Sequence, residues 1–194
     1  AKVSALAKGV RRPTSRKAGH LGLFGRAELM LARGRNLDIV TQAESLEEFE
    51  GLRSDLLRFT YACYAAELMD RFAQEEEGNA ALYDLMLRAL RWFSSAEDLR
   101  LWMRYFELRL LGYAGFQPEL FQCLHCQQEI QPTINAFSAT EVGLLCSRCA
   151  SQDPRARQVS VNAQKVLRYL QTHDVQDVRR LRLNESTHLE VEQI

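Results

Sequence analysis

Four cysteines in two close pairs are the residues of this sequence whose types and spacing most clearly predict chemistry. Cys123 and Cys126 are separated by two residues, as are Cys146 and Cys149, and nineteen residues lie between the pairs. A Cys-x-x-Cys turn presents two thiolate sulfurs on one side of a tetrahedral zinc site, and a second such turn completes the four ligands. We therefore predict that Cys123, Cys126, Cys146 and Cys149 bind one structural Zn²⁺ ion.

Two other interpretations of these cysteines stay open. A redox-active dithiol or an iron–sulfur site also uses closely spaced cysteines, and thiols without metal are a further alternative. We do not expect a catalytic zinc, because four cysteines fill the coordination sphere and leave no position for water. His125, inside the first pair, is predicted to be an ordinary surface residue, and Cys63 is predicted to be a small core residue of a helix.

A second group of candidates lies in the stretch KGVRRPTSRKAGH, residues 8–20, which contains five Lys or Arg and no acidic residue. Clustered cations attract nucleic-acid phosphates because each neutralised phosphate releases condensed counterions. The proline and the glycines of residues 8–20 are typical of a loop between two strands. The alternative is that these are ordinary solvated surface charges. The candidates for phosphate contact are Lys8, Arg11, Arg12, Arg16 and Lys17 in this stretch, and Arg26, Arg33 and Arg35 after it.

Charge is distributed unevenly along a chain whose 25 basic and 25 acidic residues balance. Residues 1–40 contain nine Lys or Arg and two acidic residues, a net charge of +7. Residues 41–100 contain thirteen acidic and six basic residues, a net charge of −7. Such segregation favours a basic interaction surface beside an acidic one.

Several functional classes find no support in the sequence. Phosphate-binding Gly-rich loops, the His-Glu-x-x-His motif and the Gly-x-Ser-x-Gly motif are absent, so we expect a binding protein and not an enzyme. No apolar run of about 18 residues occurs that could cross a bilayer. The chain opens with no secretory leader, and its paired cysteines suggest metal in a reducing compartment, so we expect a cytoplasmic protein.

The spacing of apolar residues changes along the chain. It predicts the strands and helices that position the candidate residues. Alternation predicts strands over residues 3–7, 20–32 and 37–43. From residue 45 a spacing of three or four predicts one long helix to residue 72, a second beginning at the N-cap Asn79, and a third opened by Ser95 and Asp98 as a capping box. After a cysteine-bearing insertion, helices are predicted over residues 160–171, 174–183 and from 184 or 186 to 194. The expected fold class is α+β.

Four stretches of the chain resemble the bacterial RecO family of recombination mediators. They are ALAKGVRRPTSR, GRNLDIVTQAESLEEFEGLRSDLLRFTYACYAAELMDRF, LRLWMRYFELRLLGYAGFQPELFQCLHC and GLLCSRCA, and they occur in the family's order over almost the whole chain. The resemblance implies a partial N-terminal OB-fold β-barrel over residues 1–45, with its first strands expected to be missing. It further implies an α-helical domain over residues 46–118, an inserted four-cysteine zinc finger over 119–154, and C-terminal helices over 155–194 that complete the helical domain and are expected to be cut short.

The resemblance also implies a function and partners. A RecO-like protein binds single- and double-stranded DNA, promotes annealing of complementary strands, and assists RecA loading in recombinational DNA repair by the RecFOR pathway. The implied partners are RecR and single-stranded-DNA-binding protein, and the implied location is the nucleoid-associated cytoplasm, with no membrane contact. On this interpretation the basic residues hold phosphates while the bases stay exposed to pair.

Three rival functions share some of these features. An RNA- or ribosome-associated zinc-ribbon protein would also combine a basic loop with two Cys-x-x-Cys turns, and would depend on 2′-hydroxyl groups. A thiol oxidoreductase would use one Cys-x-x-Cys pair without metal. A scaffolding protein would bind partners through its acidic helices, and the basic loop would then have no function of its own.

Overall fold

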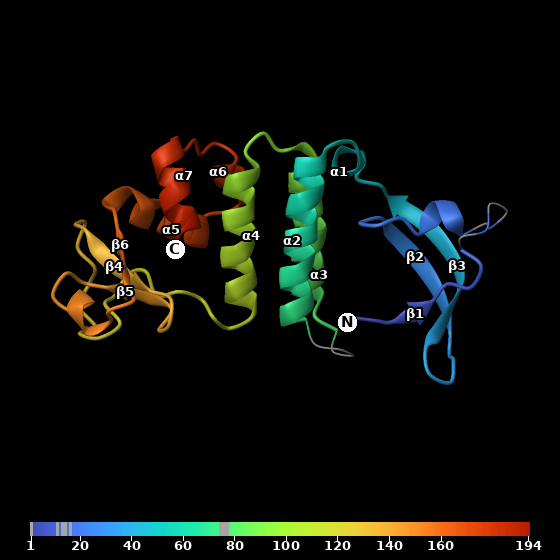
Figure 1. Ribbon diagram of the computed structural model, residues 1–194, viewed down its shortest axis with the longest axis horizontal. Coiled ribbons are helices and arrows are strands. Elements are labelled where there is room, and N and C mark those ends of the chain that lie inside the picture. The colour runs from blue at the N-terminus through green and yellow to red at the C-terminus, as the bar shows by residue number, and fades with distance from the viewer. Residues whose placement is uncertain (1, 11, 13–14, 16, 74–77) are drawn as a thin grey trace. The chain divides into compact units, whose positions relative to one another are not determined.

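The computed structural model describes residues 2–10, 12, 15, 17–73 and 78–194, and the chain divides into two compact units, Ala1–Leu99 and Arg100–Ile194 (Figure 1). Strands followed by helices form the first unit, and a small sheet with further helices forms the second. The predicted α+β fold class is therefore confirmed. The finer domain boundaries after residues 45, 118 and 154 stay predictions.

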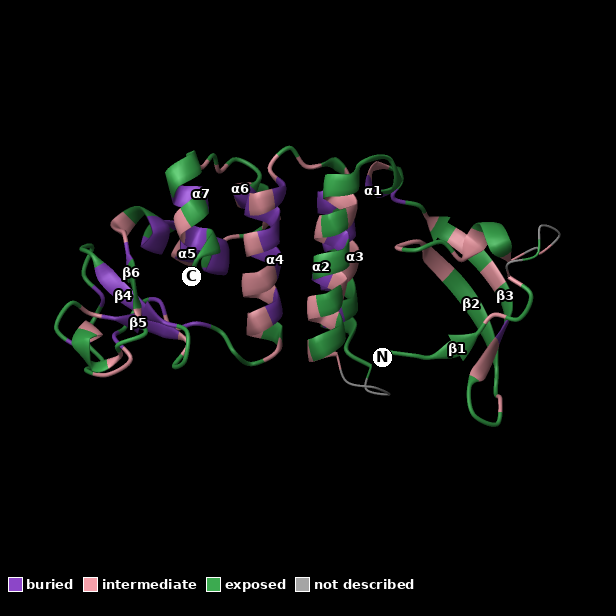
Figure 2. Cartoon of the chain, viewed as in Figure 1, coloured by how far each residue is buried: buried purple, intermediate pink, exposed green. Residues whose placement is uncertain are grey.

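The sheet of the first unit contains β1 (Ala5–Leu6), β2 (Arg26–Ala32) and β3 (Asp38–Glu47) in the order β1-β3-β2. The strand β1 pairs with β3 in parallel, and β2 pairs with β3 in antiparallel orientation. Most residues of β2 are exposed, and Val40 is the only residue of these three strands that is buried (Figure 2). This sheet therefore adds little to the core, which lies mainly in the helices.

Two predicted strand boundaries are wrong. The strand predicted to start at residue 20 begins at Arg26, because residues Ala18–His20 form a short 3-10 helix instead. The Nδ1 atom of His20 accepts a hydrogen bond from the main-chain N–H of Ser45 at 3.1 Å, which holds this helix against β3. The strand predicted to end at residue 43 continues as β3 to Glu47, into residues predicted to be helical.

Three helices complete the first unit: α1 (Glu50–Ser54), α2 (Leu56–Phe72) and α3 (Ala80–Ser95). The single helix predicted from residue 45 is broken at Asp55, whose carboxylate accepts hydrogen bonds from the N–H groups of Leu57 and Arg58 at 2.9 and 3.1 Å and so caps α2. On α2 the buried residues are Ala62 and Ala65, and Cys63, predicted to be a core residue, is exposed.

Close backbone approach holds α1 against α3. A Cβ atom placed on Gly51 would lie 2.0 Å from the carbonyl oxygen of Ser94, so only glycine fits there. The guanidinium of Arg58 donates to the carbonyl oxygens of Phe93 and Ala96 at 2.8 and 2.9 Å. The last carbonyl groups of a helix have no N–H partner within the helix, so Arg58 caps the end of α3. Ser95 belongs to the last turn of α3, so the capping box predicted for the next helix is wrong.

The second unit combines helices with a second sheet. Its strands β4 (Asn135–Ser138), β5 (Gly143–Leu145) and β6 (Arg157–Val159) are antiparallel in the order β5-β4-β6. The helix α4 (Leu99–Tyr113) precedes this sheet, and α5 (Val161–Thr172), α6 (Val175–Val178) and α7 (Glu185–Glu192) follow it. The N-caps of these last three helices are Ser160, Asp174 and Asn184, close to the predicted starts.

Ion pairs tie α7 to the start of α4. Arg100 lies 2.7 Å from a carboxylate oxygen of Glu185 and 2.6 Å from one of Glu192. The carboxylate of Glu190 accepts hydrogen bonds from the hydroxyl and the main-chain N–H of Ser160, and so joins α7 to the start of α5. In the described ranges no helix is long and apolar enough to span a lipid bilayer.

Candidate metal centre and nucleic-acid interface

The four predicted ligands lie together in the second unit. The Sγ atoms of Cys123, Cys126, Cys146 and Cys149 all lie within 4.8 Å of one another, and those of Cys126 and Cys146 are 3.8 Å apart. Sulfur atoms at the corners of a tetrahedron, each about 2.3 Å from a central zinc ion, are about 3.8 Å apart. The donor set therefore fits one metal ion, as the spacing predicts.

Local turns place each pair of cysteines. In the first turn the N–H of Gln127 donates to the carbonyl oxygen of Cys123 at 2.9 Å, and Gln127 adopts a left-handed φ of 58°. In the second, the N–H groups of Cys149 and Ala150 both donate to the carbonyl oxygen of Cys146 at 2.9 Å. These tight turns leave the thiols of each pair on the same side.

Hydrogen bonds also join the two turns without any metal. The N–H of Leu124 donates to the carbonyl oxygen of Leu144 at 3.0 Å, and the N–H of Cys146 donates to the sulfur of Cys123 at 3.4 Å. The first turn is thus held against β5, which leads directly into the second turn. The fold of this segment therefore brings the four cysteines together by itself. Metal binding then has to order a shorter part of the chain.

The environment of the thiols favours anionic sulfur at two positions. Burial raises the pKa of Cys123, but N–H donors of Cys126, Cys146 and His125 outweigh burial and lower that pKa to about 6. Burial also opposes ionisation of Cys146, whose pKa is nevertheless lowered by the N–H groups of Cys149 and Arg148. Burial and hydrogen bonds to the neighbouring sulfurs raise the pKa of Cys149 to about 12. A cation would displace the shared protons.

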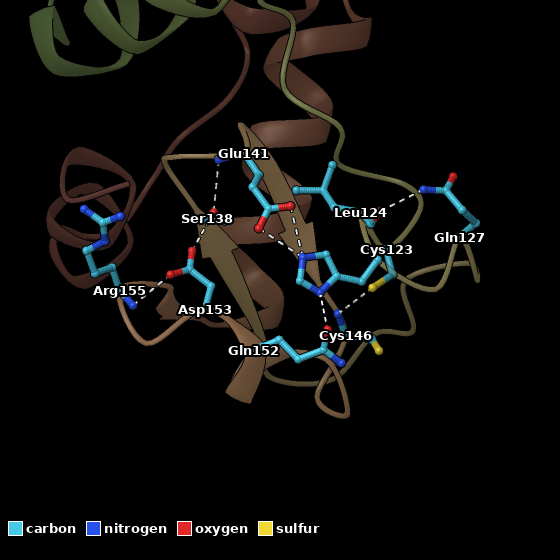
Figure 3. A network of polar contacts seen from close by, with 10 residues as sticks. Cys123, Leu124, Gln127, Ser138, Glu141, Cys146, Gln152, Asp153 and Arg155 are labelled. Atoms are coloured by element: carbon cyan, nitrogen blue, oxygen red, sulfur yellow. Dashed lines mark hydrogen bonds and ion pairs between the residues drawn. The ribbon is translucent and has the colours of Figure 1, made fainter.

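His125 has a role that the sequence did not reveal. Its Nδ1 atom lies 2.7 Å from Oε1 of Gln152, and its Nε2 atom lies 3.0 Å from both carboxylate oxygens of Glu141 (Figure 3). The hydrogen bond to Glu141, and then the one to Gln152, raise the pKa of His125. The imidazole therefore joins the first cysteine turn to the β4–β5 turn and to the segment after the second cysteine turn.

A second set of hydrogen bonds closes the same segment. The hydroxyl of Ser138 donates to Asp153 at 2.6 Å and accepts from the N–H of Glu141 at 3.1 Å (Figure 3). The hydrogen bond from Ser138, and then that from the N–H of Arg155, lower the pKa of Asp153. We use the name metal module for residues 119–154, the segment that these contacts and the cysteines hold together.

The helix α5 fixes the metal module through polar side chains spaced at i, i+4 and i+7. The side-chain amide of Gln164 donates to the carbonyl oxygens of Thr133 and Val159, both at 2.8 Å. Arg168 donates to the carbonyl oxygen of Leu120 at 2.7 Å, and Gln171 to that of Pro118 at 2.8 Å. Gln164 and Gln171 are buried, so these bonds are shielded from water and orient the module on α5.

The basic candidates fall into two groups in the first unit, both on its sheet. Lys8 and Arg12 are exposed in the segment between β1 and β2, and Arg33 and Arg35 are exposed in the turn between β2 and β3. None of these four cations lies within 4.0 Å of a carboxylate among the described acidic residues. Arg11 and Arg16 lie outside the described residues.

The other two basic candidates have structural partners. The Nζ atom of Lys17 donates to the carbonyl oxygen of Val40 at 2.9 Å. Arg26 lies 4.0 Å from the carboxylate of Glu47, which also accepts two hydrogen bonds from Arg91 at 2.8 and 2.7 Å. Lys17 and Arg26 are also half-buried, unlike the four exposed cations, and Arg26 has an acidic neighbour.

Both groups of exposed cations lie in connections next to the start of β3 or leading away from it. Lys8 follows β1, whose Leu6 pairs with Ile39 near the start of β3, and Arg33 and Arg35 belong to the turn that leads into β3. Gly34 makes the turn possible, because a Cβ atom there would lie 1.9 Å from the carbonyl oxygen of Leu37.

The fold and site together define an α+β protein with N-terminal OB-type strands, a helical region and a four-cysteine metal module. Family models named "Recombination protein O N terminal" and "Recombination protein O C terminal" match residues 1–49 and 53–194. The chain belongs to the recombination protein O (RecO) family.

Curated relatives agree with this assignment. The chain is 41% identical over 189 residues to the DNA repair protein RecO of Roseiflexus sp. (strain RS-1), a match that covers 97% of this chain and 67% of that protein. It is 37% identical over 190 residues to that of Dehalococcoides mccartyi, covering 98% and 75%, and 40% identical over 195 residues to that of Desulforudis audaxviator, covering 100% and 77%. The predicted family is thus confirmed.

Proposed function

We propose that this protein is a DNA-repair mediator that binds single- and double-stranded DNA through the sheet of its first unit and promotes annealing of complementary strands. Membership of the RecO family gives it a role in DNA repair, since its relatives are named DNA repair protein RecO. The observation that carries the DNA-binding proposal is the set of four exposed cations without described acidic partners, Lys8, Arg12, Arg33 and Arg35.

Electrostatics determines how such a surface would bind. Each phosphate that a cation neutralises releases counterions, and on single strands the logarithm of the binding constant falls by about 0.7 per contact for each tenfold rise in salt. Four contacts would give a slope of about −3. Arg11 and Arg16 remain additional candidates, and Lys17 and Arg26 contribute less because their charges face protein oxygens.

Contact through phosphates would leave the bases free to pair. Phe24 is the one aromatic residue of the basic segment, residues 1–40, and its ring packs edge-on against Phe59 of α2 with centroids 5.4 Å apart. Base stacking on this segment is therefore a minor contribution, and binding should depend little on sequence. Two strands whose repulsion is screened by the same cations would anneal without any covalent step, so we propose a binding protein and not an enzyme.

We propose zinc as the ion of the metal module. Four thiolates in a closed set suit zinc in a structural role, in which the ion links the two turns and stabilises the module. Cys123, Cys126, Cys146 and Cys149 would hold it. The module carries four acidic residues and one basic residue, a net charge of −3, which disfavours phosphate contact by the module itself.

This charge distribution separates the proposal from its nearest rival. An RNA-associated zinc ribbon would place its candidate cations on the zinc module, whereas here the module has a net charge of −3 and the four candidate cations lie in the connections between strands of the first unit. Competition between single-stranded DNA and RNA of equal length and sequence tests the choice. Similar affinities, or a preference for DNA, support the proposal, and a clear preference for RNA would favour the rival.

The protein partners that we propose are RecR, single-stranded-DNA-binding protein and RecA. The protein would assist the loading of RecA onto DNA, in the cytoplasm and in association with the nucleoid. These partners follow from the family and not from any described contact. Binding assays with each purified partner test them one by one.

A charge-reversal series tests the DNA-binding proposal directly. Arg12→Glu, Arg33→Glu and Arg35→Glu are each compared with Arg88→Glu, a reversal of an exposed arginine on α3 that changes the net charge equally. In fluorescence anisotropy with a labelled single-stranded oligonucleotide at about 0.1 M salt, loss of one contact should weaken binding about fivefold. Unchanged affinity in all three variants, or an equal loss in Arg88→Glu, would refute the assignment of the surface.

A further inference from the structure

The four thiols of the metal module differ sharply in exposure. Cys123 and Cys149 are buried, at 0% and 7% exposed, whereas Cys126 is exposed and Cys146 is half-buried. Each cysteine turn therefore contains one buried and one more exposed cysteine. The Sγ atoms of the two more exposed cysteines lie 3.8 Å apart.

We propose that Cys126 and Cys146 form a peroxide-sensitive modification site, at which oxidation links the two turns by a disulfide and releases the metal. A zinc ion keeps its ligands as thiolates, the form of cysteine that attacks peroxides. Cys126 is the exposed cysteine of the four, so we expect hydrogen peroxide to reach it first. Cys146 is half-buried, and its Sγ atom is 3.8 Å from that of Cys126, which makes it the partner for the second step.

The reaction balances with hydrogen peroxide as the oxidant. The Cys126 thiolate attacks one peroxide oxygen, so that an S–O bond forms, the O–O bond breaks and hydroxide leaves. The Cys146 thiolate then attacks this sulfenic sulfur, so that the S–S bond forms, the S–O bond breaks and a second hydroxide leaves. The two sulfurs together lose two electrons, which the peroxide takes up, and the ion loses two of its four ligands.

The fold predicts a disulfide between the turns and not within either turn. The bonds from Leu124 to Leu144 and from His125 to Glu141 and Gln152 hold the turns together independently of the metal. Cys123 stays shielded because it is fully buried and accepts a hydrogen bond from the N–H of Cys146. The oxidised module should therefore stay folded, with Cys123 and Cys149 reduced, and reduction should restore the site.

Cys63 provides an internal comparison. It is exposed on α2 and does not belong to the only described group of cysteines close enough to share an ion. Oxidation there yields a sulfenic or higher acid, or a bond between two chains, but no disulfide within the chain. The test therefore uses the variant Cys63→Ser, which keeps all four candidate ligands.

The experiment treats zinc-loaded Cys63→Ser protein with hydrogen peroxide in the absence of DNA, and follows zinc release with a chromophoric chelator and disulfides by peptide mass mapping. The expected result is release of the zinc ion in step with a Cys126–Cys146 disulfide, with full rebinding of zinc after reduction. A disulfide within either turn would overturn the proposal. The proposal would also be overturned if zinc stays bound at a peroxide concentration that oxidises Cys63 in the unmodified protein.

Discussion

The Nζ atom of Lys17 lies 2.9 Å from the main-chain carbonyl oxygen of Val40, and the hydrogen bond between them ties the basic segment to β3. Val40 is buried, so the lysine's charge faces the sheet. Arg12, only five positions earlier, is exposed and has no described acidic partner. Of these two neighbouring cations, one is therefore bonded to the sheet, and the other is exposed and is the one proposed as a phosphate contact.

Neutralising these two residues should have different effects. Lys17→Met removes the hydrogen bond to Val40 and should lower the free energy of unfolding by about 1 kcal/mol, because a carbonyl oxygen loses a charged donor. Arg12→Met should leave stability unchanged and weaken binding of single-stranded DNA several-fold. Thermal unfolding and anisotropy measured on both variants check this. The opposite pattern would show that Lys17 is the phosphate contact.

His125 should matter for metal retention although it is not a ligand. In His125→Ala the first cysteine turn loses its links to Glu141 and Gln152, so the module should release zinc to a competing chelator about tenfold more readily. Thr140→Ala, an exposed change beside Glu141 in the same turn, is the matched control and should behave like the unmodified protein. Equal zinc affinity in all three proteins would contradict this role of the His125 hydrogen bonds.

The Arg100–Glu192 pair predicts a pH-dependent contribution to stability. The hydrogen bond from Arg100 lowers the pKa of Glu192, so the pair's contribution is fully present above the ordinary carboxyl pKa of 4.5 and is lost as the pH falls through the lowered value. Glu192→Gln should therefore reduce the free energy of unfolding by about 1 kcal/mol or less at pH 7, and the difference should shrink below about pH 4.

Glu185 provides the control for this pair. Its side chain also contacts Arg100 but is 71% exposed, compared with 30% for Glu192, so Glu185→Gln should have a smaller effect. Chemical denaturation of both variants at several pH values measures the contribution. A Glu192→Gln difference that does not change with pH would mean that its carboxylate is not the stabilising group.

Gly51 tests the packing of α1 on α3. Gly51→Ala forces a methyl group against the carbonyl oxygen of Ser94, 2.0 Å from the ideal Cβ position, and should destabilise the first unit by about 3 kcal/mol. Gly19→Ala is the control, because a Cβ atom there meets nothing within 4 Å. Circular dichroism during urea denaturation measures both. Equal stability of the two variants would show that α1 can shift without cost.

The sequence predicted those features that depend on short spacings. Cys123, Cys126, Cys146 and Cys149 meet because each pair is a single turn, and Asn79 caps α3 because its side chain reaches an N–H group three residues ahead. Such local geometry can be derived from neighbouring residue types alone. The α+β class followed from the change of period near residue 45.

Features that depend on distant partners could not be derived in this way. The break at Asp55 was missed, since a helical period alone does not tell a continuous helix from two helices. Cys63 was placed in the core, but the buried residues of α2 are Ala62 and Ala65. Lys17 looked equivalent to Arg12 because its partner, Val40, lies 23 positions away. His125 looked like a surface residue because Glu141 and Gln152 come from other turns of the module.

Salt dependence of DNA binding tests the central claim most directly, because it counts the phosphates that the exposed cations hold. For the unmodified chain the logarithm of the binding constant for single-stranded DNA, plotted against the logarithm of salt concentration, should have a slope of about −3. In the variant with Lys8, Arg12, Arg33 and Arg35 all changed to Gln, the slope should lose the part of about −3 that these four residues supply, and only the smaller part due to the other basic candidates should remain. A steep slope that survives these four changes would contradict the claim, as would an unmodified chain that does not bind DNA at low salt.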